Sequence, residues 1–160
     1  MENRTAYIAL GSNLGDREAT LNRALRMMDQ TGDIEVRRVS HWFETQPAGG
    51  PPGQGKYLNG VAEVVTALEP PALLAELQQI ENALGRDRPR EERWGPRTCD
   101  LDILLMGDLV LDTPELTIPH PRMHERRFVL EPLAEIAAGL VHPVMKKTVL
   151  ALLKELGGHR

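Results

Sequence analysis

Two aspartates, Asp100 and Asp102, stand one residue apart in a segment rich in aliphatic residues. Side chains of a β-strand alternate between its faces, so both carboxylates are expected on one face, roughly 7 Å apart along the backbone. Two neighbouring carboxylates repel one another unless a cation compensates them. Mg²⁺ binds carboxylate oxygens together with water and substrate phosphate. The pair therefore predicts a metal-assisted phosphate site, and a solvated strand face that merely carries two aspartates is the alternative interpretation.

An arginine-rich segment directly precedes the two aspartates. Its members are Arg86, Arg88, Arg90, Arg93 and Arg97. Guanidinium groups stay charged and bind phosphate oxygens bidentately. A pair of carboxylates beside such a segment is what a metal–polyphosphate site requires. The alternative is that the arginines pair with Asp87, Glu91 and Glu92 on a solvated loop, and we expect at least one or two of the five to do only that.

Four further residues could bind a flat heterocycle or a phosphate. Tyr57 and Asn59 share a strand face, where a ring could stack on a ligand and an amide could bond its edge. A buried pair with no ligand is an equal alternative. Phe128 opens an apolar helix, which on its own is more typical of a core residue. His120, held between two prolines, is either a phosphate or base ligand or a structural loop residue.

The elements that must position these residues follow from periodicity and turn signals. Strands are predicted over residues 5–10, 34–43, 57–66 and 98–106, with a possible bulge near Arg37 and a short edge strand over 109–111. Helices are predicted from Asp16 to Gly32 and over residues 70–84, 128–136 and 146–156. Residues 11–15 lack the Lys-Ser/Thr of a Walker A loop and favour a tight strand-to-helix turn. Residues 47–55, rich in Gly and Pro, favour a mobile loop.

This order of elements predicts an α+β fold of the ferredoxin-like class, an α/β sandwich. Helices would pack on one face of an antiparallel sheet, and the active site would lie on the other side. Cys99, Leu101, Ile103 and Leu105 would then face the helix-packed core, opposite to the aspartates. Gln78 and Glu81 lie three residues apart on a polar face of their helix, so both could reach one ligand.

Composition limits the class of protein. The chain has 160 residues, 41% of them hydrophobic and 26% charged, which predicts one folded domain spanning residues 1–160. A net charge of −4 disfavours a nonspecific nucleic-acid binder. The single cysteine, Cys99, forms no intramolecular disulfide and fits a reducing compartment. We expect a cytoplasmic protein with no membrane association, because no apolar run approaches ~20 residues and the first residues lack a signal-peptide core.

Four segments together resemble the 6-hydroxymethyl-7,8-dihydropterin pyrophosphokinase family. They are AYIALGSNLG at residues 6–15, YLN at 57–59, RWGPRTCDLDIL at 93–104 and LTIPHP at 116–121. The similarity runs in order along almost the whole chain, and the third segment is the most specific. The loop after Thr45 and the arginine segment each look one residue longer than in some members. Glu115 and Pro121 stand where some members carry a basic and an aromatic residue, so those two contacts are not carried over.

The resemblance implies an ATP-dependent enzyme of folate biosynthesis that transfers pyrophosphate to the hydroxymethyl group of the pterin and releases AMP. It implies that Asp100 and Asp102 hold two Mg²⁺ ions and are catalytic, together with Arg86 and Arg97. The implied pterin-binding residues are Thr45, Ala48, Tyr57, Asn59, Trp94 and Phe128. The implied ATP-binding residues are Gln78, Glu81, Arg86, Arg88, Trp94, Arg97, Ile103, Thr117, His120 and Arg126. A monomer is expected, with a dimer possible.

Three rival functions remain open from the sequence. A kinase for another hydroxylated heterocycle would release ADP instead of AMP. A ferredoxin-like nucleic-acid-binding module would use Tyr57, Phe128 and the arginines to stack and neutralise bases and phosphates, but the paired aspartates argue against it. A small-molecule sensor would bind pterin and ATP without turnover.

Overall fold

The computed structural model describes residues 2–46, 55–85 and 99–157 of the chain. Five strands form the main sheet, in which β4 (Tyr57–Thr66) and β1 (Arg4–Ser12) are the long central pair. β2 (Ile34–Val39) and β3 (Phe43–Thr45) both pair with β4, and β5 (Asp100–Met106) pairs with β1. All these pairings are antiparallel, as the sequence predicted for an α+β fold.

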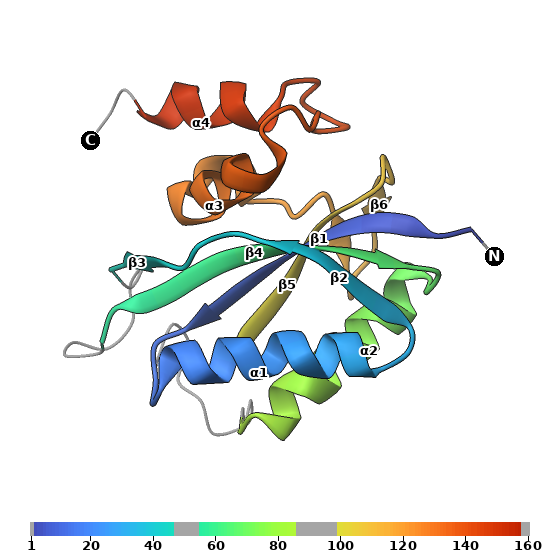
Figure 1. Ribbon diagram of the computed structural model, residues 1–160. Helices are drawn as coiled ribbons and strands as arrows, with labels where there is room; N and C mark the ends of the chain where they lie inside the picture. The colour runs from blue at the N-terminus through green and yellow to red at the C-terminus, as the bar shows by residue number, and fades with distance from the viewer. Residues whose placement is uncertain (1, 47–54, 86–98, 158–160) are drawn as a thin grey trace.

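Helices lie on both sides of this sheet (Figure 1). Helices α1 (Arg17–Gln30) and α2 (Pro70–Ala83) cover one face, where Leu21, Leu73 and Leu77 join the larger apolar core. Helices α3 (Arg127–Ala137) and α4 (Val149–Gly157) lie on the other side, and a second core of Val61, Leu104, Leu130 and Leu133 holds them to it. The expectation of helices on one face thus holds for α1 and α2, whereas α3 and α4 cover part of the face that carries the site.

Local chemistry explains where the two helices of the first layer begin. The Asp16 side chain accepts a hydrogen bond from the Ala19 amide at 3.2 Å and caps α1, as expected from its type. Helix α2 opens on Pro70, whose fixed φ and missing N–H suit the first turn. In the described part of the chain, no helix combines the length and apolar character that crossing a membrane requires.

The predicted strand over residues 34–43 is two strands, β2 and β3, because Ser40 interrupts the ladder. The Ser40 hydroxyl accepts a hydrogen bond from the Val61 amide, and the Ser40 amide donates to the Val61 carbonyl, both at 2.9 Å. The predicted bulge is confirmed, since the β2–β4 register shifts between Val36 and Arg38. The predicted edge strand over 109–111 lies outside the main sheet, where β6 (Leu111–Asp112) pairs with β7 (Thr117–Ile118).

A second bulge corrects the placement of Leu105. The β1–β5 register pairs Tyr7 with Leu105 but Ile8 with Ile103, so Leu104 is the extra residue. Cys99, Leu101 and Ile103 face the α1/α2 core as predicted. Beyond the bulge the alternation is reset, and Leu105 packs in the α3/α4 core together with Leu104. The prediction that Leu105 faces the first core was therefore wrong.

β5 lies at the edge of the sheet, and two groups from outside the sheet form hydrogen bonds with its outer backbone atoms. The Glu81 carboxylate, only 1% exposed, accepts a hydrogen bond from the Leu101 amide at 2.7 Å. Farther along, the His120 amide donates to the Leu104 carbonyl at 2.9 Å. A buried edge without such partners would carry unpaired backbone groups at considerable cost. These contacts fix the strand that carries Asp100 and Asp102.

Replacing Gly60 by alanine should destabilise the fold, because a Cβ at this position would lie 2.5 Å from two ring carbons of Trp42. The ring packs against the larger core and must shift. Overpacking of this kind costs about 1–3 kcal/mol. Urea unfolding should show that loss in Gly60→Ala but less than about 0.5 kcal/mol in Gly139→Ala, because nothing lies within 4 Å of a Cβ at the exposed Gly139. Equal stability of the two variants would contradict this packing.

Candidate active site

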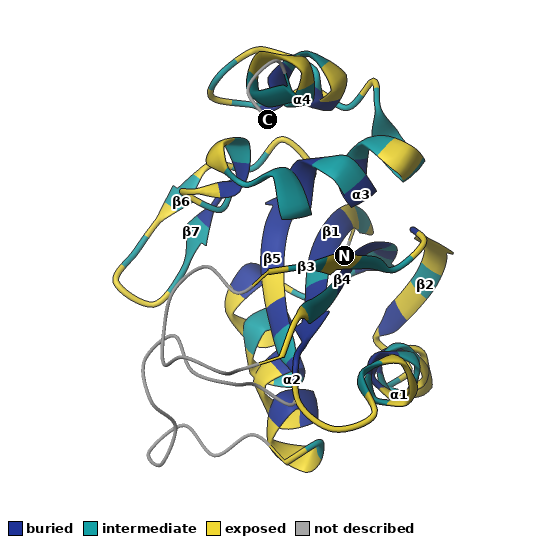
Figure 2. Ribbon diagram, turned by 90° about the vertical axis from the view of Figure 1, so that its left-hand side faces the viewer, coloured by how far each residue is buried: buried dark blue, intermediate teal, exposed yellow. Residues whose placement is uncertain are grey.

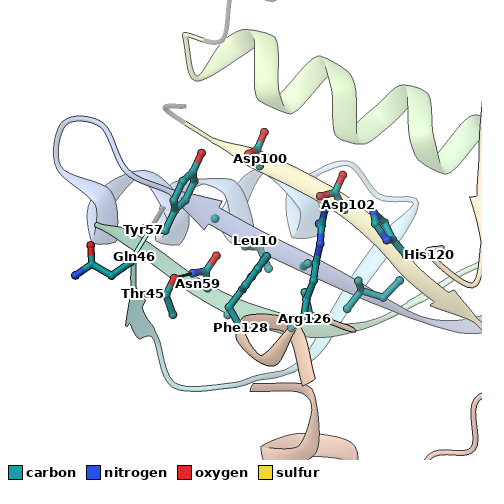
Figure 3. Close-up of a pocket in the computed structure, with 15 residues that line it drawn as sticks. Leu10, Thr45, Gln46, Tyr57, Asn59, Asp100, Asp102, His120, Arg126 and Phe128 are labelled. Atoms are coloured by element: carbon teal, nitrogen blue, oxygen red, sulfur yellow. Dashed lines mark hydrogen bonds between the residues drawn. The ribbon is translucent and has the colours of Figure 1, made fainter. Parts of the chain in front are cut away.

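A cavity of about 150 Å³ opens on the α3 side of the sheet. β1, β3, β4 and β5 line it from the sheet, and the start of α3 closes one side (Figure 3). It lies on the part of this face that α3 and α4 leave uncovered. Figure 2 shows exposed and half-buried residues along the strands below α3. The cavity therefore occupies the sheet side on which the sequence predicted the site.

The floor of the cavity is the central strand β1, which has almost no side-chain bulk on this face at Ala9 and Gly11. Gly11 is paired with Asn59 on β4 and with Asp100 on β5. Ala9 is likewise paired with Asp102 on β5. Adjacent strands lie about 4.8 Å apart, so residues on β4 and β5 face one another across about 10 Å of floor. The result is a trough with β4 side chains along one bank and β5 carboxylates along the other.

The β5 bank carries both aspartates. Asp100 is half-buried, Asp102 is exposed, and both line the cavity on the common face that the alternation predicts. Figure 3 shows the two carboxylates pointing to the same side of the strand. In the described residues no group of three or more His, Cys, Asp or Glu side chains could hold a metal ion. Paired carboxylates suit Mg²⁺, which keeps water and phosphate oxygens in its shell.

The β4 bank carries the residues expected to bind a flat ring. The Asn59 amide donates to the Thr45 hydroxyl at 2.5 Å, which orients the amide edge. Tyr57 and Phe128 also line the cavity, and Figure 3 places Asn59 between these two rings. Thr45 is paired with Tyr57 across β3 and β4. One bank thus combines two aromatic rings with an oriented hydrogen-bonding group.

Arg126 connects the two banks. Its guanidinium carbon lies 5.5 Å from the centre of the Phe128 ring, within range of a cation–π contact. The side chain extends from the start of α3 toward Asp102 (Figure 3). A fixed positive charge therefore stands between the aromatic wall and the carboxylates, where a phosphate chain would cross.

His120 lies beside Asp102 (Figure 3). Its imidazole is neutral at physiological pH because its pKa is lowered. Burial, with help from the charges of Arg126 and Arg122, lowers the pKa of His120 to about 4. Its Nδ1 accepts a hydrogen bond from the Arg122 amide at 3.2 Å. An accepting Nδ1 places the proton on Nε2. The imidazole can therefore donate one hydrogen bond into the cavity without adding a charge.

Four residues assigned to ATP binding lie away from this cavity. The Glu81 carboxylate is bonded to the Leu101 amide of β5. Ile103 is 3% exposed and packs in the α1/α2 core. The Ile103 side chain is therefore unavailable to a ligand, and only its backbone could contact one. Gln78 is exposed on α2. The half-buried Thr117 on β7 lies 3.5 Å from Asp112 through its hydroxyl. A nucleotide touching all four would have to extend well past the cavity.

Several assigned residues lie outside the described part of the chain. They are Ala48, Arg86, Arg88, Trp94 and Arg97. Residues that sequence reasoning missed are the floor positions Ala9 and Gly11, and Gln46 beside Thr45. The floor could have been found from alternation along residues 7–11, which puts Ala9 and Gly11 on one face. What alternation alone does not give is the register that sets Gly11 between Asn59 and Asp100.

Comparison with known proteins identifies relatives of this chain. The sequence profile of the 7,8-dihydro-6-hydroxymethylpterin-pyrophosphokinase (HPPK) family matches residues 7–138. The chain is 53% identical over 134 residues to a 2-amino-4-hydroxy-6-hydroxymethyldihydropteridine pyrophosphokinase of Bacillus subtilis, covering 84% of this chain and 78% of that protein. It is 46% identical over 156 residues to the protein of the same name from Haemophilus influenzae, covering 98% of this chain and 95% of that one.

Solved structures support the fold. A Plasmodium falciparum HPPK-DHPS crystal structure with pteroate superimposes with a TM-score of 0.74 at 15% identity, covering 96% of this chain and 42% of that chain. The chain thus spans less than half of that longer protein, and the likeness at this identity concerns the fold alone. The profile match over residues 7–138 and the two relatives carry the assignment: the chain belongs to the 7,8-dihydro-6-hydroxymethylpterin-pyrophosphokinase family.

Proposed function

We propose that the chain transfers the pyrophosphoryl group of ATP to 6-hydroxymethyl-7,8-dihydropterin, giving the pterin diphosphate and AMP, in folate biosynthesis. The observation that carries this proposal is the trough itself. One bank offers rings and an amide for a flat heterocycle, the other offers paired carboxylates for a metal-bound phosphate, and the floor between them is nearly bare. Family membership supplies the identity of the two substrates.

On the pterin side, Tyr57 and Phe128 would stack on the two faces of the ring. Offset stacking of aromatic planes adds to the free energy of burying them. Asn59, held by Thr45, would donate to and accept from the edge of the ring. Ala48 and Trp94 remain sequence-based proposals for the same subsite. The ring would then be fixed with its hydroxymethyl group directed over the β1 floor toward β5.

On the phosphate side, Asp100 and Asp102 would hold two Mg²⁺ ions. Bound there, the ions would neutralise phosphate charge and help to orient the attacking and leaving oxygens. Arg126 would add its fixed charge, and the neutral His120 would donate through Nε2 to a phosphate oxygen. Arg86, Arg88 and Arg97 are proposed, from the sequence, to close on the same phosphates, with Arg86 and Arg97 stabilising charge in the transition state. Gln78, Glu81, Ile103 and Thr117 remain proposals for the rest of the nucleotide.

Catalysis in this arrangement depends chiefly on position. The pterin hydroxyl oxygen attacks the β-phosphorus while the bond from that phosphorus to the oxygen of the α-phosphate breaks, so AMP leaves. Binding both reactants in fixed positions across the trough lowers the entropy cost of bringing the hydroxyl oxygen to the β-phosphorus. The hydroxyl proton is lost as the new bond forms, and metal coordination or an aspartate of the β5 bank is proposed to assist its loss. Neutral His120 has its Nδ1 occupied by the Arg122 amide and is unsuited to that task.

Three broader features are proposed with the function. Residues 1–160 act as one pyrophosphokinase domain, because both apolar cores share the same sheet. A single chain supplies both banks of the trough, which supports an active monomer. We also propose a cytoplasmic enzyme without membrane or nucleic-acid partners, since its two substrates are small molecules and the net charge is −4.

A direct assay tests the function. The enzyme is incubated with 6-hydroxymethyl-7,8-dihydropterin, ATP and Mg²⁺, and the nucleotide product is separated by chromatography. AMP in equal amount to the pterin diphosphate is the expected result. ADP would identify a kinase that transfers a single phosphoryl group, and binding without product would identify a sensor.

Changing Asp100 or Asp102 to asparagine should lower kcat by about 100-fold or more, the scale seen when a group that stabilises transition-state charge is removed. Asparagine keeps the shape of each side chain but removes the charge that compensates Mg²⁺. Thermal unfolding should stay close to that of the parent enzyme. Asp108→Asn, in the exposed turn after β5, is the matched control and should keep full activity. Undiminished turnover in both site variants would show that the metal site is elsewhere.

Changing Gly11 to alanine should weaken pterin binding selectively. The added Cβ would lie 3.0 Å from Asn59 Oδ1 and 3.6 Å from Tyr57 Cδ1, so it displaces the amide that orients the ring. Loss of about one hydrogen bond predicts a rise of roughly tenfold in the KM for pterin, with the KM for ATP unchanged. Gly139→Ala, whose Cβ would meet nothing within 4 Å, is the control. Equal effects on both substrates would count against the trough.

Acid should weaken the fold in part through His120. Its folded-state pKa of about 4 lies below the ordinary value of 6.5, so the unfolded chain binds more protons between these values. The free energy of unfolding should therefore fall as pH drops from 6.5 toward 4, and His120→Asn should remove this part of the fall. Urea unfolding of both proteins at pH 7.5 and pH 5 checks it. If the two proteins lose the same stability on acidification, the buried neutral imidazole is not present.

A further inference from the structure

Arg17, the first residue of α1, joins two segments that are distant from it in sequence. Its Nη2 donates to Glu44 Oε2 on β3 at 2.8 Å, and its Nη1 donates to the Lys56 carbonyl at 2.8 Å. Lys56 directly precedes β4. One guanidinium group therefore holds the short strand β3 and the entry to its partner strand β4 at the same time.

These two segments belong to β3 and to the start of β4, the strands proposed to bind the pterin ring on their opposite face. Thr45 is paired with Tyr57, and Glu44 is paired with Leu58. Because side chains alternate along a strand, Glu44 and Leu58 face α1 while Thr45 and Tyr57 face the cavity. Leu58 accordingly packs on the α1/α2 core, whereas Thr45 and Tyr57 line the trough. Arg17 thus contacts the side of the β3–β4 ribbon opposite to the pterin-binding side.

A second contact fixes the same ribbon from the end of β1. The Asn13 side chain, 6% exposed, donates to the Gly55 carbonyl at 3.1 Å. Gly55 and Lys56 are therefore held at two successive carbonyls, one by Asn13 and one by Arg17. The entry to β4 is positioned by the turn between β1 and α1 as well as by its own strand partners.

The stability of α1 does not explain an arginine at this position. A cation in the first turn of a helix is opposed by the helix dipole, and the cap of α1 is already provided by Asp16. The Arg17 hydrogen bond and charge lower the pKa of the Glu44 carboxyl, which keeps it ionised and paired. The favourable contacts of Arg17 are those to β3 and to the residue before β4.

We propose that Arg17 is a positioning residue for pterin recognition, which sets the spacing between Thr45 on β3 and Tyr57 on β4 without touching the substrate. The inference rests on the proposed function, because it assigns the supported wall to the pterin. Asn59 depends on the same spacing, since its amide bonds the Thr45 hydroxyl across the two strands. ATP and the β5 carboxylates would lie on the other bank. They do not depend on the brace, by which we mean the contacts of Arg17 with Glu44 and Lys56.

The kinetic test compares Arg17→Ala, Arg17→Lys, Glu44→Gln and the double variant Arg17→Ala/Glu44→Gln. Arg17→Ala should raise the KM for pterin about fivefold to twentyfold at saturating ATP and leave kcat and the KM for ATP within about twofold. Arg17→Lys should recover part of the loss, because an ammonium group reaches only one of the two acceptors well. The double variant should be no worse than Arg17→Ala, since Arg17→Ala already removes the ion pair that Glu44→Gln removes.

Arg4→Ala is the matched control. Arg4 also forms an ion pair with a distant glutamate, Glu69, at 3.4 Å, and its side chain is 34% exposed against 30% for Arg17. That pair joins the start of β1 to the residue before α2, far from the trough. Its loss should change neither KM.

Hydrogen exchange provides a readout that does not depend on turnover. In Arg17→Ala without substrate, amides of residues 43–46 and 55–59 should exchange faster, while those of α1 and β5 should not. An inactive parent enzyme would refute the proposed function, and the exchange pattern would still test the brace. An unchanged KM for pterin in Arg17→Ala, equal changes in both KM values, or exchange that rises throughout the chain would overturn the proposal.

Discussion

Two small residues on one face of the central strand decide what this sheet can hold. Ala9 and Gly11 leave β1 nearly bare between β4 and β5, and the antiparallel register sets Asn59 and Asp100 on either side of Gly11. A larger residue at Gly11 would fill the space between the ring-binding bank and the carboxylates. In the proposed function the chemistry depends on this lack of side-chain bulk, because the two substrates would meet above β1.

The rest of the fold serves to keep the two banks in place. The bulge at Leu104 lets β5 present Asp100 and Asp102 to the trough and then direct Leu104 and Leu105 into the core beneath α3. This core anchors α3, whose first turn carries Phe128. On the outer edge of β5, Glu81 and the His120 amide complete the backbone hydrogen bonding. Glu81, which the sequence assigned to ATP, thus supports the strand that carries Asp100 and Asp102.

Much of this organisation could be predicted from local patterns. Alternation placed Asp100 and Asp102 on one face, the capping signal at Asp16 began α1 correctly, and β4 has the predicted bounds. The failures arise where a distant contact overrides a local pattern. Ser40 bonds Val61 and divides one predicted strand into two, and the β5 bulge reverses the side to which Leu105 points. The brace from Arg17 to Glu44 and Lys56 joins segments that no local signal connects.

The central claim is that pterin and metal-bound phosphate meet across the β1 floor, one on each bank. Substituting Mn²⁺ for Mg²⁺ tests this most directly, because the paramagnetic ion speeds the nuclear relaxation of nearby protons. With a non-cleavable ATP analogue and the pterin bound, the hydroxymethyl protons should relax much faster than the protons at the far end of the ring. The effect should disappear when Asp100 and Asp102 are both changed to asparagine. Equal relaxation along the whole pterin, or an effect that survives in that variant, would contradict the account.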